Sequence, residues 1–199
     1  MAKIYGLTGS IGMGKSAVAA MIAKMGIPLF DADAQVHRLQ GPGGKALALI
    51  EARFPGTTGP EGVNRAKLAA IVLAHPHERK ALEAIIHPMV WAARRAFLRL
   101  HASRPLIILD IPLLFETGRQ RDVDRIIVVS APADVQRSRA LSRPGMTAEK
   151  FEALAARQVP DAEKRRQAHF IVDSSQGLDQ ALAQVKAIVA ILMREAEAS

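Results

Sequence analysis

A glycine-rich segment near the start of the chain has the pattern of a phosphate-binding loop. Residues 9–16, GSIGMGKS, match G-x-x-x-x-G-K-[ST]. The glycines let successive backbone N–H groups point into one concavity, where phosphate oxygens can accept hydrogen bonds. Lys15 would reach the β- and γ-phosphates of a nucleotide, and the Ser16 hydroxyl would hold Mg²⁺. The alternative is an accidental glycine turn before a helix, which chance supplies in on the order of one chain in a hundred.

Two aspartates, Asp31 and Asp33, follow the apolar segment Ile27 to Phe30. On an extended segment, side chains two residues apart share a face. A kinase that acts on a hydroxyl needs a carboxylate that orients the nucleophile and accepts its proton. Asp33 also precedes an apolar-periodic segment, and Asp is a good helix N-cap. On the residues alone, catalysis and capping are about equally supported for Asp33.

Basic residues gather between Gln136 and Arg166. Arg139 and Arg143 are four residues apart, so on a helix they would lie on one face. Arginines on a mobile segment can close over phosphates, exclude water and stabilise charge during transfer. The alternative is a solvated basic face.

These candidate residues need a scaffold, and the chain alternates strand and helix patterns. The predicted strands are Lys3–Thr8, Ile27–Phe30, Leu106–Leu109, Arg125–Ser130 and His169–Val172. The predicted helices are Lys15–Met25, Leu178–Met193 and a mostly helical stretch from Ala34 to about Ala102, interrupted near residues 41–44 and 55–62. The alternation predicts an α/β fold with a parallel sheet of about five strands flanked by helices. The long helical stretch exceeds what a crossover needs, so we expect it to form an insert.

Composition narrows the class of protein. The 199 residues suit one domain, and 27 Lys and Arg against 19 Asp and Glu give a net charge of +8, which favours polyanionic partners. The absence of cysteine excludes disulfides, thiolate zinc sites and a cysteine nucleophile. No signal-peptide pattern opens the chain, and its most apolar later run is too short to cross a bilayer, so we expect a cytoplasmic protein without a membrane partner. Scattered arginines and 4% aromatic residues argue against nucleic acid as a partner.

The sequence motifs outside the loop narrow the class of nucleotide-binding protein. The only asparagine, Asn64, lies in GVNRAK without the Lys-x-Asp that a guanine-reading motif requires, so a regulatory GTPase is excluded. A small-molecule kinase fits best. Another nucleoside or nucleotide kinase and a nucleotide-dependent assembly switch remain as alternatives.

Several blocks, in order along the chain, resemble the dephospho-coenzyme A kinase family. They are GLTGSIGMGKS, PLFDADAQVHR, IIHPMV, DIPLLFE and AHFIVDSSQG, with Arg139 and Arg143 matching the paired lid arginines. The resemblance implies one P-loop NTPase-type kinase domain over 1–199, with a helical acceptor-binding insert over about 34–103 and a helical lid over about 137–167. It also implies ATP- and Mg²⁺-dependent phosphorylation of the ribose 3′-hydroxyl of dephospho-CoA, the last step of coenzyme A biosynthesis.

The resemblance implies a role for each candidate residue. Catalysis is assigned to Lys15, Asp33 and Arg143, with Asp33 acting on the ribose hydroxyl. ATP binding is assigned to Gly9, Ile11, Gly12, Met13, Gly14, Lys15, Ser16, Arg139 and Arg143, and the metal to Ser16. Acceptor binding is assigned to Asp33, His37, His87, Leu113 and Leu114. We expect a monomer with small-molecule partners only, and self-association stays open.

Some residues carry a second interpretation or depart from the family pattern. His87-Pro88 is interpreted first as a helix break, because the residue before proline avoids the helical region. Leu113 and Leu114 would wall the acceptor cleft, with core packing as the alternative. Asp110 ends a strand where P-loop proteins often keep a magnesium-directed acid, and we expect it to act through water or structurally. His169 and Ser174 replace a family Asp and Asn, which bears on the adenine pocket.

Overall fold

The computed structural model describes residues 2–197. This part of the chain forms two compact units. One unit combines the residues up to Phe30 with those from His101 onward, and the other is Asp31–Leu100. Within residues 2–197, no helix combines the length and the hydropathy that a bilayer crossing requires.

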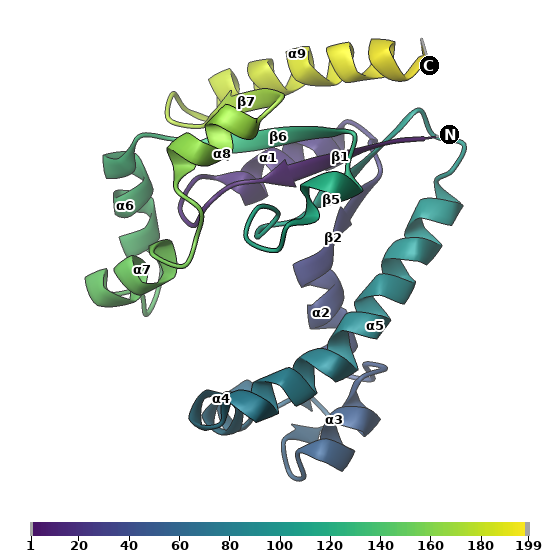
Figure 1. Ribbon diagram of the computed structural model, residues 1–199, viewed down its shortest axis with the longest axis vertical. Helices are drawn as coiled ribbons and strands as arrows, with labels where there is room; N and C mark the ends of the chain where they lie inside the picture. Colours follow the sequence, from purple (N-terminus) through teal and green to yellow (C-terminus); the bar gives the residue numbers. More distant parts are fainter. Residues whose placement is uncertain (1, 198–199) are drawn as a thin grey trace. The chain divides into compact units, whose positions relative to one another are not determined.

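The first unit is built on a sheet that contains five strands in the described part of the chain. They are β1 (Lys3–Thr8), β2 (Leu29–Asp31), β5 (Leu106–Asp110), β6 (Arg125–Ser130) and β7 (Phe170–Asp173), in the spatial order β2-β5-β1-β6-β7 (Figure 1). β1 pairs in parallel with both β5 and β6, and β6 pairs in parallel with β7. The predicted parallel sheet of about five strands is confirmed.

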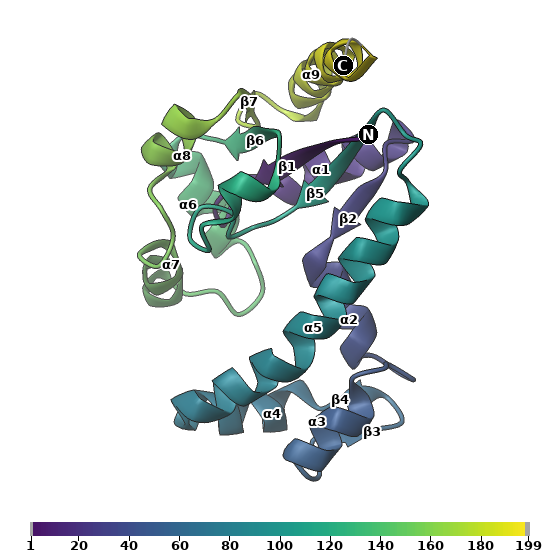
Figure 2. The same ribbon diagram turned by 45° about the vertical axis from the view of Figure 1, so that its right-hand side comes forward.

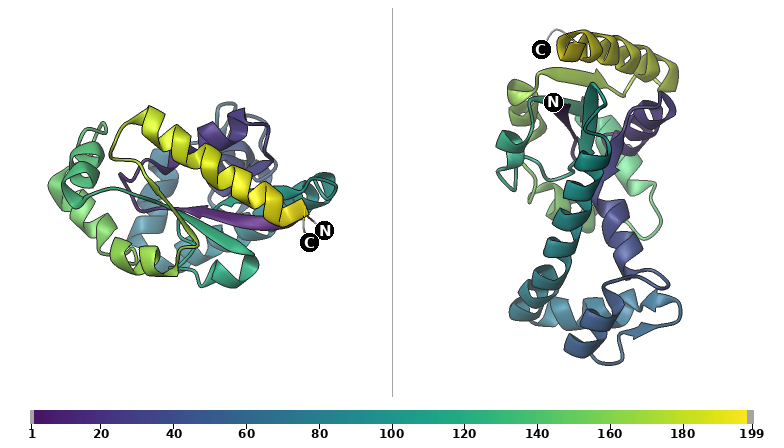
Figure 3. Two further views of the ribbon diagram at one scale, coloured as in Figure 1. Left: turned by 90° about the horizontal axis from the view of Figure 1, so that it is seen from above. Right: turned by 90° about the vertical axis from the view of Figure 1, so that its right-hand side faces the viewer.

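Helices of the first unit cover both faces of this sheet. They are α1 (Lys15–Lys24), the 3-10 helix η1 (Arg119–Asp122), α6 (Ala133–Leu141), α7 (Ala148–Ala155), α8 (Asp161–Gln167) and α9 (Leu178–Glu197). Ile127 and Val129 share one core cluster with residues of α1 and α9, whose yellow ribbon runs over the strands in Figure 3 (left). Ile126 and Val128 lie in a second cluster with Leu114 and Phe115. Alternate residues of β6 therefore bury both faces, as the continuous aliphatic run predicts.

The second unit is helical and has its own core. It contains α2 (Ala32–Gln40), α3 (Leu47–Arg53), β3 (Thr58–Gly59), β4 (Gly62–Val63), α4 (Arg65–Ala74) and α5 (Pro76–Leu100). Leu39, Ile50, Phe54, Leu68 and Ile86 form the buried cluster that joins its four helices. The β3–β4 hairpin lies beside α3 (Figure 2) and occupies the interruption expected near residues 55–62. The unit spans 31–100, against the 34–103 expected for the insert.

Helix α5 continues through Pro88, so the interpretation of His87-Pro88 as a helix break is wrong. A proline inside a helix removes one backbone hydrogen bond and bends the axis. Packing on both sides of the proline offsets that cost, because Ile86 is buried and Met89 packs against the same cluster. The α5 ribbon changes direction part-way along its length in Figures 1 and 2.

Candidate active site

The segment between β1 and α1 forms the predicted phosphate-binding loop. Gly12 and Gly14 have φ angles of 80° and 83°, a left-handed region that favours glycine. A Cβ at Gly12 would lie 2.5 Å from the carbonyl oxygen of Gln136, so this close approach also requires glycine. The N–H groups at the start of an α-helix carry its partial positive charge, and those of α1 face this loop end of the helix. This arrangement is suited to binding phosphate.

Lys15 is held at the mouth of the loop by a buried carboxylate. Its Nζ lies 2.6 Å from Oδ1 of Asp110, the last residue of β5. Asp110 is 2% exposed, so the ion pair neutralises a charge that water does not reach. This ion pair is a structural contact of Asp110 with the loop, and a structural role is one of the two that the sequence predicts for it. Ser16 follows in the first turn of α1, and its side chain is exposed.

Met13 contributes its backbone, not its side chain, to the loop surface. The side chain is 1% exposed, and Sδ accepts the N–H of Ala131 at 3.1 Å. Its own N–H donates to the Ser10 carbonyl at 3.1 Å, which closes the turn. The methionine at this variable motif position therefore fastens the loop to the residue that follows β6.

Arg139 and Ser174 form a polar bridge against the back of the loop. Arg139 donates from two nitrogens to the hydroxyl and the carbonyl oxygens of Ser174, both at 2.8 Å. The Ser174 hydroxyl donates in turn to the Met13 carbonyl at 2.8 Å. One of the two departures from the family pattern thus contacts the loop directly.

His169, the other departure, pairs with the start of β6. The ring Nδ1 of His169 accepts a hydrogen bond from the backbone N–H of Ile126 at 3.1 Å. The backbone N–H of His169 donates to the Ile126 carbonyl at 2.9 Å. Farther along, Asp173 accepts the N–H of Ser175 at 2.8 Å, and the hydroxyl and N–H of Ser175 lower the pKa of Asp173. His169 therefore has a structural contact at the sheet edge.

Arg143 lies outside the helix that carries Arg139. Helix α6 ends at Leu141, and Arg143 is exposed in the turn that follows. The expectation that the two arginines share a helical face is therefore wrong. Pro144 explains the difference, because the residue before a proline avoids the helical conformation, and Gly145 completes the turn with a φ of 75°.

In the second unit, Asp31 is the residue that caps α2. Its Oδ1 accepts the N–H of Ala34 at 2.8 Å, and its backbone is extended, as an N-cap requires. Asp33 lies in the first turn of α2 and is exposed. The capping alternative for Asp33 is therefore wrong, and its carboxylate is left accessible to solvent and ligands.

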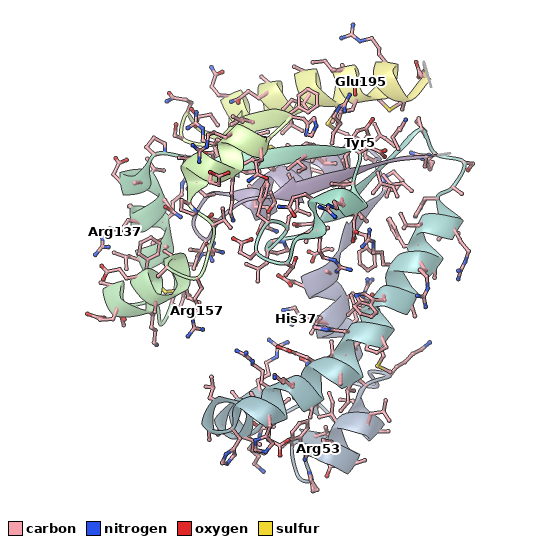
Figure 4. The ribbon with its side chains drawn as sticks, in the orientation of Figure 1. Tyr5, His37, Arg53, Arg137, Arg157 and Glu195 are labelled. Atoms are coloured by element: carbon pink, nitrogen blue, oxygen red, sulfur yellow. The ribbon has the colours of Figure 1, made fainter. Side chains whose placement is uncertain are left out.

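His37 contacts an arginine that the sequence patterns do not single out. It is exposed in the last turn of α2 (Figure 4), and its Nδ1 accepts a hydrogen bond from the guanidinium of Arg65, the first residue of α4. His87 is exposed on α5, where its ring stacks near that of Trp91 with centroids 6.0 Å apart. Arg65 thus joins His37 as a candidate group for an anionic ligand.

The two leucines that follow β5 have different environments. Leu113 is 44% exposed, which leaves it available to a ligand. Leu114 is fully buried and packs with Phe115, Ile126 and Val128. The core-packing alternative therefore describes Leu114 in this structure.

Comparison with known proteins shows which family and which proteins the chain is similar to. Residues 3–180 match the protein family described as "Dephospho-CoA kinase". The chain is 56% identical over 186 residues to a dephospho-CoA kinase of Novosphingobium aromaticivorans, covering 94% of this chain and 92% of the relative. It is 55% identical over 188 residues to one from Mesorhizobium japonicum, covering 94% of each. Among solved structures, TT1252 from Thermus thermophilus is similar with a TM-score of 0.78 and 34% identity, covering 96% of this chain and 98% of that one.

Proposed function

The chain belongs to the dephospho-CoA kinase family, and on that premise we propose that it transfers the γ-phosphoryl group of ATP to the ribose 3′-hydroxyl of dephospho-CoA, giving CoA and ADP. One observation carries the proposal. The family match over residues 3–180 includes both the phosphate loop and the whole helical unit 31–100. This match supports the proposal that the chain contains both the donor-binding and the acceptor-binding elements.

The donor binds at residues 9–16. Backbone N–H groups of the loop and the first turn of α1 donate to the phosphate oxygens, and the Lys15 ammonium exchanges Asp110 for the β- and γ-phosphates. Because the positive charge stays with the transferring group, it stabilises the transition state more than the bound substrate.

Mg²⁺ fits this loop as a partner of ATP. This ion keeps several waters and takes one or two protein oxygens together with substrate phosphates. The exposed Ser16 hydroxyl and the Asp110 carboxylate are oxygens that would hold it. Within residues 2–197, no three His, Asp or Glu side chains gather into a cage for a metal, which agrees with an ion that arrives with its nucleotide. When bound, Mg²⁺ supplies positive charge to the β- and γ-phosphate oxygens.

Asp33 is the proposed base. Its carboxylate orients the 3′-hydroxyl and accepts its proton while the oxygen forms a bond to the γ-phosphorus and the bond from that phosphorus to ADP breaks. Its exposure, and the use of Asp31 as the cap, support this role. His37 and Arg65 are proposed to bind the acceptor's phosphates, because a guanidinium forms paired hydrogen bonds with phosphate oxygens.

Arg143 is proposed to act from the lid, which we assign to α6, α7 and α8 with their connecting turns. A guanidinium that arrives when the lid closes stabilises charge on the phosphoryl group during transfer. Its exposed position in a turn, where backbone movement costs little packing, supports this role.

A coupled assay of ADP release tests the reaction. With ATP and Mg²⁺, ADP should appear when dephospho-CoA is added and not when adenosine replaces it. Mass spectrometry should then show CoA, heavier than the acceptor by one phosphoryl group. ADP release that ignores the acceptor would favour an assembly switch, and release with adenosine would favour a nucleoside kinase.

The setting of the enzyme is part of the same proposal. We propose a cytoplasmic monomer whose partners are ATP and dephospho-CoA, supported by the absence of cysteine, which suits a reducing compartment. Light scattering on the purified protein checks the oligomeric state.

A further inference from the structure

Two glutamine side chains bind the same residue of the phosphate loop. Oε1 of Gln158 accepts the N–H of Ile11 at 3.0 Å, and Nε2 of Gln136 donates to the Ile11 carbonyl at 2.8 Å. All of these contacts are partly buried. The chemistry determines each amide's orientation, since only an oxygen can accept from an N–H and only a nitrogen can donate to a carbonyl. We call this pair, Gln136 and Gln158, the glutamine clamp.

The backbone around each glutamine makes contacts of its own. Beside Gln158, the N–H of Val159 donates to Oε1 of Glu116 at 2.8 Å, and the fully buried Lys164 lies 2.8 Å from the same oxygen. On α6, the carbonyl of Gln136 lies against Gly12 so closely that a Cβ there would clash. Each glutamine thus belongs to a segment that has further contacts with the rest of the unit, so the clamp is not a chance surface contact.

The two glutamines come from opposite ends of the α6–α7 segment. Gln136 lies on α6, and Gln158 follows α7. Their two bonds satisfy both backbone groups of Ile11, so the loop cannot change shape at this residue without breaking one of them. The position of α6 and α7 is therefore linked to the shape of the loop.

We propose that Gln136 and Gln158 are positioning residues that hold the phosphate loop in its ATP-binding shape and couple that shape to the lid. The inference rests on the proposed function for the identity of the nucleotide and of the lid. A loop already ordered before ATP arrives loses less conformational freedom on binding, which raises affinity. Because both glutamines act on one residue, loss of either one releases it.

The binding test uses the full chain and ATP with Mg²⁺, without acceptor. Gln158→Ala and Gln136→Ala should each weaken ATP affinity about tenfold, as expected for one lost hydrogen bond that orders a loop. The double variant should be about as weak as the weaker single variant, since neighbouring groups that share a partner are not additive. Gln167→Ala is the matched control, because this exposed glutamine on α8 bonds only to Glu163 among the contacts described, and it should bind ATP normally. In steady-state assays, the KM for dephospho-CoA at saturating ATP should stay unchanged.

Hydrogen exchange of the loop in the nucleotide-free protein is a second measurement. A general loss of folding would not produce the difference that we expect between the two variants below. Gln158→Glu keeps an oxygen that accepts the Ile11 N–H, so residues 9–16 should stay protected. Gln136→Glu removes the donor and places a carboxylate against a carbonyl, so the same residues should exchange faster. Equal protection in both variants would overturn the proposal, as would unchanged ATP affinity in the alanine variants or losses that multiply in the double variant. A wild-type chain that binds ATP but does not phosphorylate dephospho-CoA would refute the proposed function and leave this test intact.

Discussion

At the scale of single residues, Lys15 and Asp110 explain how a charged site can fold before its ligand arrives. A carboxylate that is 2% exposed is costly to bury alone, and the Lys15 ammonium at 2.6 Å neutralises it. When phosphates replace Asp110 as the partner of Lys15, the carboxylate needs another cation. The Mg²⁺ that we propose to accompany ATP would supply one, and release of the lysine would then be linked to binding of the metal.

The first prediction concerns Lys15. Lys15→Ala should lower kcat by on the order of 10²–10³-fold, because the group that neutralises the transferring phosphate is lost. Lys24→Ala is the matched control, since Lys24 is exposed in the last turn of the same helix and should leave kcat unchanged. Turnover and circular-dichroism melting are measured for both. A folded Lys15→Ala protein with near-normal turnover contradicts the assignment of the loop.

The second prediction separates the two neighbouring aspartates. Asp33→Asn should lower kcat by about 10²–10⁴-fold with an unchanged melting temperature, because a proton acceptor is lost and no cap is disturbed. Asp31→Ala should cost about 1 kcal/mol of stability through loss of the cap on α2. Steady-state kinetics and urea unfolding of both variants check this. If Asp33→Asn keeps its activity while Asp31→Ala loses catalysis, Asp31 is the base.

At the scale of elements, β5 and β6 were predictable because each contains a buried run of aliphatic residues. All of Leu106–Asp110 is buried, and a strand buried on both faces leaves such a run in the sequence. Helix ends were harder. Asp31 and Asp33 are equally good caps by type, and only the extended backbone of Asp31 decides between them. At Pro88 the helix continues although the residue before a proline avoids the helical conformation, because tertiary packing on both sides of Pro88 stabilises α5.

Some of the candidate site lay beyond sequence reasoning for a physical reason. The contacts of Gln136, Gln158 and Arg65 join residues far apart in the chain, and glutamine or arginine at such positions forms no local pattern. Arg143 is different, because Pro144 beside it already indicated the end of α6. The loop itself was predictable, since its function depends on local backbone shape.

The third prediction concerns the buried ion pair between Glu116 and Lys164. Burial raises the pKa of Glu116, but the hydrogen bonds from Lys164 and from backbone N–H groups outweigh it, so the net pKa lies below the ordinary 4.5. A carboxyl whose pKa falls on folding stabilises the protein above its unfolded-state pKa, and that contribution is lost as pH falls through the folded-state pKa. Glu116→Gln should therefore cost about 3 kcal/mol at pH 7, because it leaves Lys164 buried and unpaired.

Urea unfolding between pH 7 and pH 3 checks this pair. The stability gap between wild type and Glu116→Gln should begin to narrow below the ordinary pKa of 4.5, and it should close as pH falls through the lower folded-state pKa of Glu116. Adding Lys164→Met to Glu116→Gln should recover much of the loss, since an apolar pair can replace a buried ion pair. A gap that stays constant down to pH 3 contradicts the role of the carboxylate charge.

The fourth prediction concerns Arg143 and the lid. Arg137, labelled in Figure 4, joins α6 to α7 through its ion pair with Glu152 at 3.0 Å, and Arg143 is exposed in the turn between these helices. Arg143→Ala should lower kcat strongly and ATP affinity less, because its contact forms on closure. Arg143→Lys should recover only part, since an ammonium lacks the paired geometry of a guanidinium. Arg166→Ala, an exposed partner of Glu163, is the control, and equal small losses in both alanine variants would show only a solvated basic face.

At the scale of the whole molecule, the described part of the chain forms two units that each have a core. The first unit contains the phosphate loop and the proposed lid, and the second contains Asp33, His37 and Arg65. The chain passes between units after Phe30 and after Leu100, so Asp33 follows closely on the end of β2. Under the proposed function, the groups that bind the donor and those that bind the acceptor would each be supported by a hydrophobic core of their own unit.

The fifth prediction follows from the charge of the whole molecule. A net charge of +8 attracts ATP and dephospho-CoA, which both carry several negative charges, and salt screens that attraction. Raising ionic strength from about 20 mM to about 200 mM at constant free Mg²⁺ should lower kcat/KM for both substrates about threefold to tenfold. The value of kcat at saturation should change less, because screening weakens encounter more than it weakens contacts formed inside the loop. Parallel titrations with potassium chloride and potassium acetate separate screening from binding of one particular anion. A kcat/KM that stays constant over this range would contradict the prediction. It would mean that the positive charge lies away from the sites where the substrates bind and does not attract them.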